Sequence, residues 1–520
     1  MVKTRLALAG FLAAAVLRTL PALAADSHQS PLHGSLPRGP HAVGFARLQL
    51  ADATRPARAS ADGAPGSPAS RARRIDVHVW YPAAPGSTVA PMTFADAMTE
   101  QPPVRSAVDV ARREEGVRHF MGEFGGVSDD AWARLKATRL LARRDIPAAN
   151  GRYPLIISTL RPLSTSITNE FLASHGFVVA MVDGEDDAEP EESGAALEID
   201  YRDMEFAIPE LRKRPDVHAT ALGALGFSGS GFSQILLAMR HPDVAAVCDL
   251  ESAIFDDRVL HPLSRGWGYG VTALRVPFLH TYSVPLSKRE NRIADFEAMR
   301  YSTRYRYLVD APGIHHWDFA TEGMAASAVL RNRGANGARL QQAFETTNLY
   351  VLKFFTAYLK KDSEALAFLN RSPEANGVPA GLATVRALPA VTPAPTVDEV
   401  FAIVSTQGVG AVLQRLDEAR KTDPQADLFQ EARLNRLGYR LLWSESAANS
   451  IPIFRRLVEL FPASSNAYDS LAEALEAAGE RREAVAVTEK ALEVLAKQEL
   501  TPEQRRDMAE LLAARLKRLK

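Results

Sequence analysis

The spacing of apolar residues changes along this chain, and the changes predict its elements. Short apolar runs typical of buried strands occupy residues 154–158, 177–182, 219–227, 244–250, 276–282 and 305–309. Segments of helical spacing separate these runs, and a terminal helix is expected around residues 349–359. Because strands that alternate with helices form parallel βαβ units, residues 41–385 are predicted to be one α/β domain with a doubly wound sheet.

Other patterns precede and interrupt this series. Residues 43–50 and 75–81 alternate in the manner of half-buried strands, and the Ala/Pro/Gly/Ser/Arg-rich stretch between them is predicted to be a long hairpin loop. Residues 93–145 have mostly helical spacing and are expected to lie outside the sheet. Residues 26–40 are polar and rich in Pro and Gly, which predicts little order there.

Beyond residue 399 the pattern is helical only. A stretch rich in Pro, Ala, Val and Thr at residues 386–398 is typical of a linker. Beyond it, positions recur after 34 residues, so that Leu437 matches Leu471 and Gly438 matches Ala472. This is the period of tetratricopeptide helix pairs, and residues 399–520 are therefore predicted to be an all-α tetratricopeptide-like domain, with an unrelated helical bundle as the alternative. Such a tail would offer a docking surface to a protein partner.

The first residues have the features of a secretory signal peptide. Lys3 and Arg5 precede an apolar run over residues 6–17, and Ala22 and Ala24 supply a small-residue cleavage site. We therefore predict a signal peptide over residues 1–24 and a periplasmic or secreted protein, with tethering through an uncleaved signal as the alternative. The apolar run is too short to span a bilayer.

Composition and charge exclude several classes of function. The 520 residues carry a formal net charge of −1 without a basic stripe, which argues against nucleic acid as a partner. The single cysteine, Cys248, lies in an apolar run and is predicted to be a buried strand thiol. Acidic residues crowd positions 183–192 without the spacing of a calcium loop, so a solvated loop is expected, and neither a metal nor a cofactor is predicted.

The segment that carries the clearest chemical signal is 222–239. An apolar strand ends at Phe227, Ser228 follows it, and an apolar helix begins after Gly231. A serine on a strained strand-to-helix turn needs small neighbours on both sides, and Gly226 and Ser230 provide them. Ser228 is therefore the predicted nucleophile. Ser230 could be the serine of a shifted motif, but only Ser228 lets the strand run straight into the turn.

A serine hydroxyl needs a base that takes its proton. His315 and His316 follow the strand predicted at residues 305–309, close to the end of the sheet, and both compete for this role.

The base in turn needs a carboxylate that orients it. The turn after the strand at residues 276–282 has no carboxylate before Glu290. One strand earlier, Asp249 lies near the end of the run at residues 244–250 and Glu251 directly follows it. Both point to the same side, so alternation cannot separate them. Glu251 is the one nearer to the following loop.

These segments together resemble the branch of the α/β-hydrolases that contains platelet-activating-factor acetylhydrolases and dienelactone hydrolases. The resemblance covers residues 41–360 and is carried by residues 79–82, 172–180, 226–231, 250–255 and 316–319. It implies an α/β-hydrolase fold, with His316 of a His-x-x-Phe pattern as the base. It also implies Glu251 as the acid, although this chain has Glu where the relatives have Asp.

The oxyanion hole is expected to combine the backbone N–H of Gly229 with an N–H from the loop after residues 154–158. Where the relatives usually carry His-Gly, this chain has Ser-Thr-Leu-Arg-Pro at residues 158–162. Pro162 cannot donate, so the second donor is expected to be Leu160, with Arg161 as the alternative.

The predicted function is an exported serine hydrolase that cleaves carboxylic esters of small molecules or lipids through an acyl-enzyme. Ser228, His316 and Glu251 would form its triad. A serine peptidase on the same fold is an alternative, because acyl transfer from esters and amides uses the same parts. A catalytically weak binding module that docks through the helical tail is a third interpretation, and the altered oxyanion loop favours it.

Overall fold

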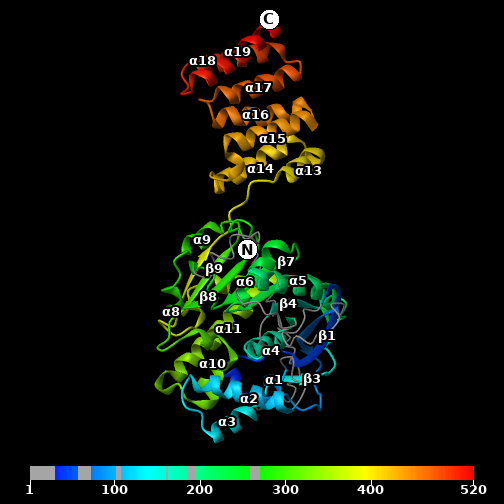
Figure 1. Ribbon diagram of the computed structural model, residues 1–520, viewed down its shortest axis with the longest axis vertical. Coiled ribbons are helices and arrows are strands. Elements are labelled where there is room, and N and C mark those ends of the chain that lie inside the picture. Colours follow the sequence, from blue (N-terminus) through cyan, green and yellow to red (C-terminus); the bar gives the residue numbers. More distant parts are fainter. Residues whose placement is uncertain are drawn as a thin grey trace, which may run out of the picture.

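A computed structural model describes residues 30–56, 72–100, 107–159, 162–184, 194–257, 270–444 and 446–520. Figure 1 shows an α/β part followed by a stack of helices. The predicted signal peptide, Leu160, and most of the predicted hairpin and acidic loops lie outside the described residues. Within the described residues, no helix is long and apolar enough to cross a membrane.

The centre of the α/β part is a mixed sheet, whose order in the described residues is β10-β9-β8-β7-β6-β4-β5-β2-β1-β3. The neighbours from β9 to β5 pair in parallel, whereas β10 with β9, β2 with β5, and β1 with β2 pair antiparallel. This confirms the predicted parallel, doubly wound sheet. The strands are β1 (Ala42–Pro56), β2 (Ala72–Ala83), β3 (Ala142–Arg144), β4 (Tyr153–Thr159), β5 (Val178–Gly184), β6 (Val217–Phe227), β7 (Val244–Leu250), β8 (Phe278–Ser283), β9 (Arg304–Val309) and β10 (Ala383–Leu388).

Helices cover both faces of the sheet, and β4 illustrates the consequence. Ile156 packs into one apolar core with α4 (Ser166–Ser174) and α11 (Gly337–Leu359). Leu155 and Ile157 pack into the opposite core with α5 (Gly194–Leu211) and α6 (Ser230–Arg240). Strands buried on both faces need continuous apolar runs, which is why the sequence pattern located them. Cys248 is fully buried in β7, as predicted.

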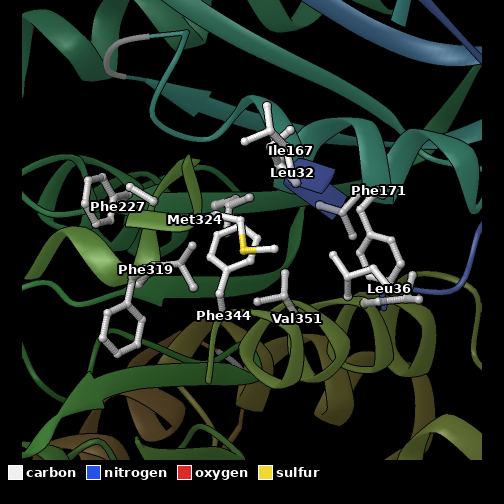
Figure 2. Close-up of a cluster of buried hydrophobic side chains, with 14 of the residues drawn as sticks. Leu32, Leu36, Ile167, Phe171, Phe227, Phe319, Met324, Phe344 and Val351 are labelled. Carbon is white, nitrogen blue, oxygen red and sulfur yellow. The ribbon is translucent and has the colours of Figure 1, made fainter. Parts of the chain in front are cut away.

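Residues 30–40 are better ordered than their composition predicts. Leu32 and Leu36 are buried in the core between α4 and α11 (Figure 2). Nε2 of the buried His33 lies 3.2 Å from Oε2 of Glu170. The prediction of little order is therefore wrong here, because two leucines four residues apart find an apolar site that only the folded domain creates.

Two further boundaries differ from the prediction. The segment at residues 93–145 contains helices, but Ala142–Arg144 forms β3 and pairs in parallel with β1 at the sheet edge. Residues 386–388, predicted to begin the linker, belong to β10, which pairs antiparallel with β9. The predicted domain end at residue 385 thus falls inside a strand. The other helices of this part are α1 (Phe94–Met98), α2 (Ala107–Gly122), α3 (Asp129–Lys136), α8 (Val284–Ser287), α9 (Ile293–Ala298), α10 (Thr321–Ala325) and α12 (Ser363–Leu369).

The C-terminal part is helical throughout its described residues. It comprises α13 (Val397–Gln407), α14 (Val409–Thr422), α15 (Glu431–Ser444), α16 (Ala447–Leu460), α17 (Ser465–Ala477), α18 (Arg481–Leu495) and α19 (Pro502–Leu519). The starts of α15 and α17 are 34 residues apart, as are those of α16 and α18. Gly438 is small because a Cβ there would lie 2.5 Å from the Phe454 ring. The tetratricopeptide-like nature of this part stays a prediction.

One aspartate joins the helical part to the sheet domain. Oδ2 of Asp423, which follows α14, accepts hydrogen bonds from Nε of Arg300 and from the hydroxyl of Tyr301, both at 2.8 Å. Arg300 and Tyr301 lie directly before β9.

Candidate active site

The turn between β6 and α6 has the geometry of a strained serine elbow. Ser228 has a φ of +56°, in the left-handed region that non-glycine residues rarely adopt. Such strain persists only where the surrounding structure enforces it, and it is concentrated at functional sites. The Ser228 N–H is held by the Leu250 carbonyl at 3.0 Å, so β7 fixes the corner.

The neighbours of Ser228 are small because the backbone passes close to itself. A Cβ on Gly226 would lie 2.6 Å from Cα of Gly231, and a Cβ on Gly231 would lie 2.6 Å from Cβ of Ser252. The predicted requirement for small residues on both sides of the serine is therefore met by contacts that the structure makes explicit.

Ser230 has a different role from Ser228. Its buried hydroxyl accepts a hydrogen bond from the Phe227 N–H and donates one to the Phe227 carbonyl, both at 2.8 Å. These bonds close the turn and leave the hydroxyl facing the backbone. The structure thus favours Ser228 over the shifted register.

His316 is the histidine that reaches the serine. It begins a 3₁₀ turn over His316–Phe319 after β9, and its Nε2 lies 2.9 Å from Oγ of Ser228. Its ring stacks on Phe227, with centroids 4.9 Å apart and planes 22° apart. A base must lie within hydrogen-bond reach of the proton that it takes, and this geometry satisfies the condition.

His315 faces another environment. Its ring lies 5.1 Å from that of Phe124, its Nε2 contacts Nη1 of Arg333, and its Nδ1 lies 3.5 Å from Oδ2 of Asp318. Asp318 also accepts a hydrogen bond from Arg333 Nη2 at 2.8 Å. These contacts hold His315 in the loop, and it is His316 that contacts the Ser228 hydroxyl.

Glu251 follows β7 and lines the same pocket as Ser228 and His316. Its φ is +53°, a second strained backbone position in the site. Both carboxylate oxygens are engaged by Ser283: Oε2 accepts from the backbone N–H at 2.6 Å, and Oε1 accepts from the hydroxyl at 2.5 Å. Among the described contacts, none is a hydrogen bond or ion pair between Glu251 and His316, so the structure does not bring these two predicted partners together.

Asp249, the other candidate acid, belongs to a buried network. Its Oδ1 lies 2.7 Å from Nδ1 of His280, and Nε2 of His280 lies 2.8 Å from Oε1 of Glu290. Glu290 also contacts Nη2 of Arg306. Sequence reasoning missed this network, because its members are 31 to 57 positions away from Asp249 in the chain and meet only through the pairing of β7, β8 and β9.

Burial shifts the pKa values of the base and the acid in opposite directions. Burial lowers the pKa of His316 to about 4, and the nearby His315 ring and Arg289 guanidinium contribute in the same direction. The imidazole is therefore neutral at physiological pH, which is the form that can accept a proton. Burial raises the pKa of Glu251 to about 7, against the hydrogen bonds from Ser283 that favour its anion.

Of the two expected oxyanion donors, Gly229 lies within the described residues and Leu160 does not. Gly229 caps the N-terminus of α6 directly after the serine. An N–H at such a helix start has no partner within the helix and is free to face an anion. Leu160 lies outside the described residues, so the second donor stays a prediction.

A pocket of about 300 Å³ opens onto the serine and the histidine. Its lining residues are Ser228, Glu251, Ala253, Pro285, Leu286, Arg289, His315 and His316. The site lies where the strand order reverses, since β5 and β6 lie on opposite sides of β4. Ligands of open α/β sheets bind at this switch point, outside the carboxyl ends of the strands. In the described part of the chain, no group of three or more His, Cys, Asp or Glu side chains could hold a metal ion.

Comparison with known proteins finds similarity among solved structures. No protein-family model and no curated protein matches the chain. Among solved structures, the chain is similar to a ferulic acid esterase from Streptomyces cinnamoneus, with 19% sequence identity and a TM-score of 0.44. The match covers 63% of this chain and 93% of that chain.

The assignment of the fold rests on the molecule itself. The parallel sheet is covered on both faces, the strained serine follows β6, and the histidine loop follows β9, the last parallel strand. The chain therefore has an α/β-hydrolase fold followed by an all-helical domain.

Proposed function

We propose that this protein is a serine hydrolase that cleaves carboxylic esters through an acyl-enzyme. The observation that carries the proposal is the hydrogen bond of 2.9 Å between Oγ of Ser228 and Nε2 of His316 at a strained elbow. A nucleophile within reach of a neutral base is the minimal requirement for acyl transfer by serine.

In the proposed reaction, Ser228 Oγ attacks the ester carbonyl while Nε2 of His316 takes the hydroxyl proton. The negative charge on the carbonyl oxygen faces the Gly229 N–H. When the carbon–oxygen bond of the ester breaks, His316 returns the proton to the departing alcohol. A water molecule then gives a proton to His316 and attacks the acyl-enzyme, and the acid leaves as Ser228 regains its proton.

Glu251 is proposed as the acid that orients His316 during this cycle. Its carboxylate lies in the same pocket, but Ser283 holds both of its oxygens. The proposal therefore requires a rotation of the Glu251 side chain from Ser283 toward the imidazole when substrate binds. Hydrogen bonds in unliganded sites are often long or misaligned and tighten in the complex.

Export of the protein and its place in a particular branch of the α/β-hydrolases are also proposals. Export rests on the basic and apolar residues 3–24, and the likeness to platelet-activating-factor acetylhydrolases and dienelactone hydrolases rests on residues 41–360. The helical part is proposed to bind a protein partner, as extended helical repeats do.

A fluorophosphonate probe tests the function directly. It should label the wild-type protein at Ser228, as read by peptide mass spectrometry, and Ser228→Ala should lose the label and about 10⁴-fold or more of the turnover of short acyl esters. Ser230→Ala is the matched control, because it removes the neighbouring hydroxyl that binds only backbone. It should keep the label and lose about 1–3 kcal/mol of stability, since it leaves a buried N–H unpaired. Labelling of Ser230 in place of Ser228 would contradict the proposal.

A further inference from the structure

The pocket beside Ser228 contains a cation that the proposed chemistry does not use. Arg289 lines this pocket together with Ser228, His316 and Leu286. It lies after α8, and its N–H bonds to the Leu286 carbonyl at 2.8 Å, which places both side chains along one turn. Its guanidinium lowers the pKa of His316, which is a further sign of its proximity to the base.

The guanidinium of Arg289 is held in place from one side. Its Nε and Nη2 donate to the same oxygen, Oδ2 of Asp256, at 3.2 and 3.0 Å. The Asp256 side chain is 1% exposed, whereas that of Arg289 is 53% exposed. Both of these bonds reach one carboxylate oxygen, and the side chain that carries the rest of the guanidinium fork lines the pocket and is half exposed. Arginine presents five N–H donors, so donors remain for a ligand.

The backbone under Arg289 is also fixed. The next residue, Glu290, has a side chain that is 2% exposed and that binds His280 at 2.8 Å and Arg306. An arginine on a free surface samples many rotamers, and ordering it reduces the gain from any contact. Here Asp256 already holds the guanidinium, and the anchored Glu290 holds the adjoining backbone, before a ligand arrives.

Among the described residues, the other groups that line the pocket offer no comparable cation. His316 is neutral because burial lowers its pKa to about 4, and burial has the same effect on His315. The oxygens of Glu251 are occupied by Ser283. Ala253, Pro285 and Leu286 are apolar. Within the described lining, a substrate with a charged end would therefore find a single cationic contact, at Arg289.

We propose that Arg289 binds a carboxylate of the substrate, so that the preferred substrates are esters whose acyl or alcohol part carries a negative charge. A planar guanidinium matches a carboxylate by paired N–H···O bonds, and such charge-assisted bonds discriminate strongly against neutral analogues. This inference deepens the proposed function and rests on it, because it names the substrate class of the same serine.

The test compares the kcat/KM values of matched esters. Monoethyl glutarate carries the charge on the acyl side, and ethyl 4-carbamoylbutanoate is its neutral analogue. 4-Acetoxybenzoate and 4-acetoxybenzamide form the corresponding pair for the alcohol side. In at least one pair, the wild-type enzyme should favour the charged ester, and Arg289→Gln should reduce this preference by about 10- to 100-fold, the effect expected of a hydrogen bond to a charged group. The affected pair identifies the side of the ester that Arg289 binds.

Two variants control the experiment. Arg289→Lys keeps a charge opposite the buried Asp256 but loses the planar fork, so it should fold and show an intermediate preference. Arg292→Gln removes a charge from the same segment, where Arg292 pairs with Asp257 and Asp295 and does not line the pocket. It should leave the preference unchanged.

The outcomes separate the inference from the proposed function. No charge preference in the wild type, or equal losses on charged and neutral esters in Arg289→Gln, would overturn the role of Arg289 while ester hydrolysis by Ser228 stands. If no ester is cleaved and Ser228 takes no label, the proposed function fails, and calorimetry with glutarate and glutaramide still decides the inference. Binding of glutarate alone, lost in Arg289→Gln, would support the anion site, and its absence would overturn it.

Discussion

His280 is buried within β8 and His316 is partly buried in the turn that follows the neighbouring strand β9, yet the two have opposite electrostatic environments. His316 contacts a serine hydroxyl, and burial, with the Arg289 guanidinium nearby, lowers its pKa to about 4. Burial alone would also lower the pKa of His280, but the carboxylates of Asp249 and Glu290 more than offset this effect and raise it to about 9. Burial therefore does not decide whether a histidine is a base or a fixed cation. Its hydrogen-bond partners do.

The same contrast separates the carboxylates at the end of β7. Asp249 points at a histidine that never reaches the pocket, whereas Glu251 lines the pocket but binds a serine. The first network is joined by hydrogen bonds within the folded chain, whereas the second lacks a contact that catalysis would need. We therefore expect substitutions in the first network to change mainly stability, and those in the second to change mainly turnover.

The largest expected effect is on the base. His316→Gln removes the only ring nitrogen described as bound to Ser228, so turnover of acyl esters should fall by about 10⁴-fold or more. His315→Gln should lower it by about tenfold or less, because His315 contacts Phe124, Arg333 and Asp318. Steady-state kinetics of the two variants decide the assignment. A reversed order would move the role of base to His315.

The second prediction concerns Glu251. If its carboxylate turns to His316 during the reaction, Glu251→Gln should lower kcat by about 10³- to 10⁴-fold with little loss of stability. Ser283→Ala frees the carboxylate from one of its two partners and should be much milder. A Glu251→Gln enzyme within tenfold of the wild type would make the site a serine–histidine dyad. Asp249→Asn, measured beside it, should lower the thermal midpoint more than the turnover, because it removes the negative charge that faces His280.

The third prediction is the direction of the pH dependence. His316 accepts a proton only above its pKa of about 4, and Glu251 is an anion only above its pKa of about 7. If both forms are required, kcat/KM rises with pH and the higher pKa sets its midpoint near 7. In Glu251→Gln, the remaining activity should rise at a lower pH. Profiles of kcat/KM from pH 4 to pH 9 measure both midpoints, and identical midpoints would exclude ionisation of Glu251 from the mechanism.

The smallest expected effect on activity comes from the His280 network, which should act on stability. His280→Gln removes the cation between the buried carboxylates of Asp249 and Glu290 and should destabilise the domain by about 3–5 kcal/mol at neutral pH. Because the folded pKa of about 9 lies above the unfolded value, this stabilisation is full below about pH 6.5 and is lost as the pH rises through 9. Thermal midpoints at pH 6 and pH 10 test this. The difference from the wild type should shrink at pH 10, whereas the exposed His218→Gln should show no difference at either pH.

The sequence by itself determined the elements and the position of the nucleophile. Apolar runs located the parallel strands, because both faces of such a strand are buried and nearly every position must be apolar. Gly226 and Gly231 located the elbow, because the backbone there approaches itself too closely for any Cβ. The 34-residue recurrence located the helix pairs of the C-terminal part. Each of these signals is local, or repeats at a fixed spacing, and can be read without knowing what packs against it.

Only the tertiary structure decided the partners. The pattern could not separate His315 from His316, because the choice depends on which ring stacks on Phe227 beside Ser228. It could not foresee that Leu32 and Leu36 complete the core between α4 and α11, or that Asp249 meets His280 and Glu290. These contacts join residues far apart in the chain, and alternation along a strand fixes the face of a side chain but not the group that it meets there.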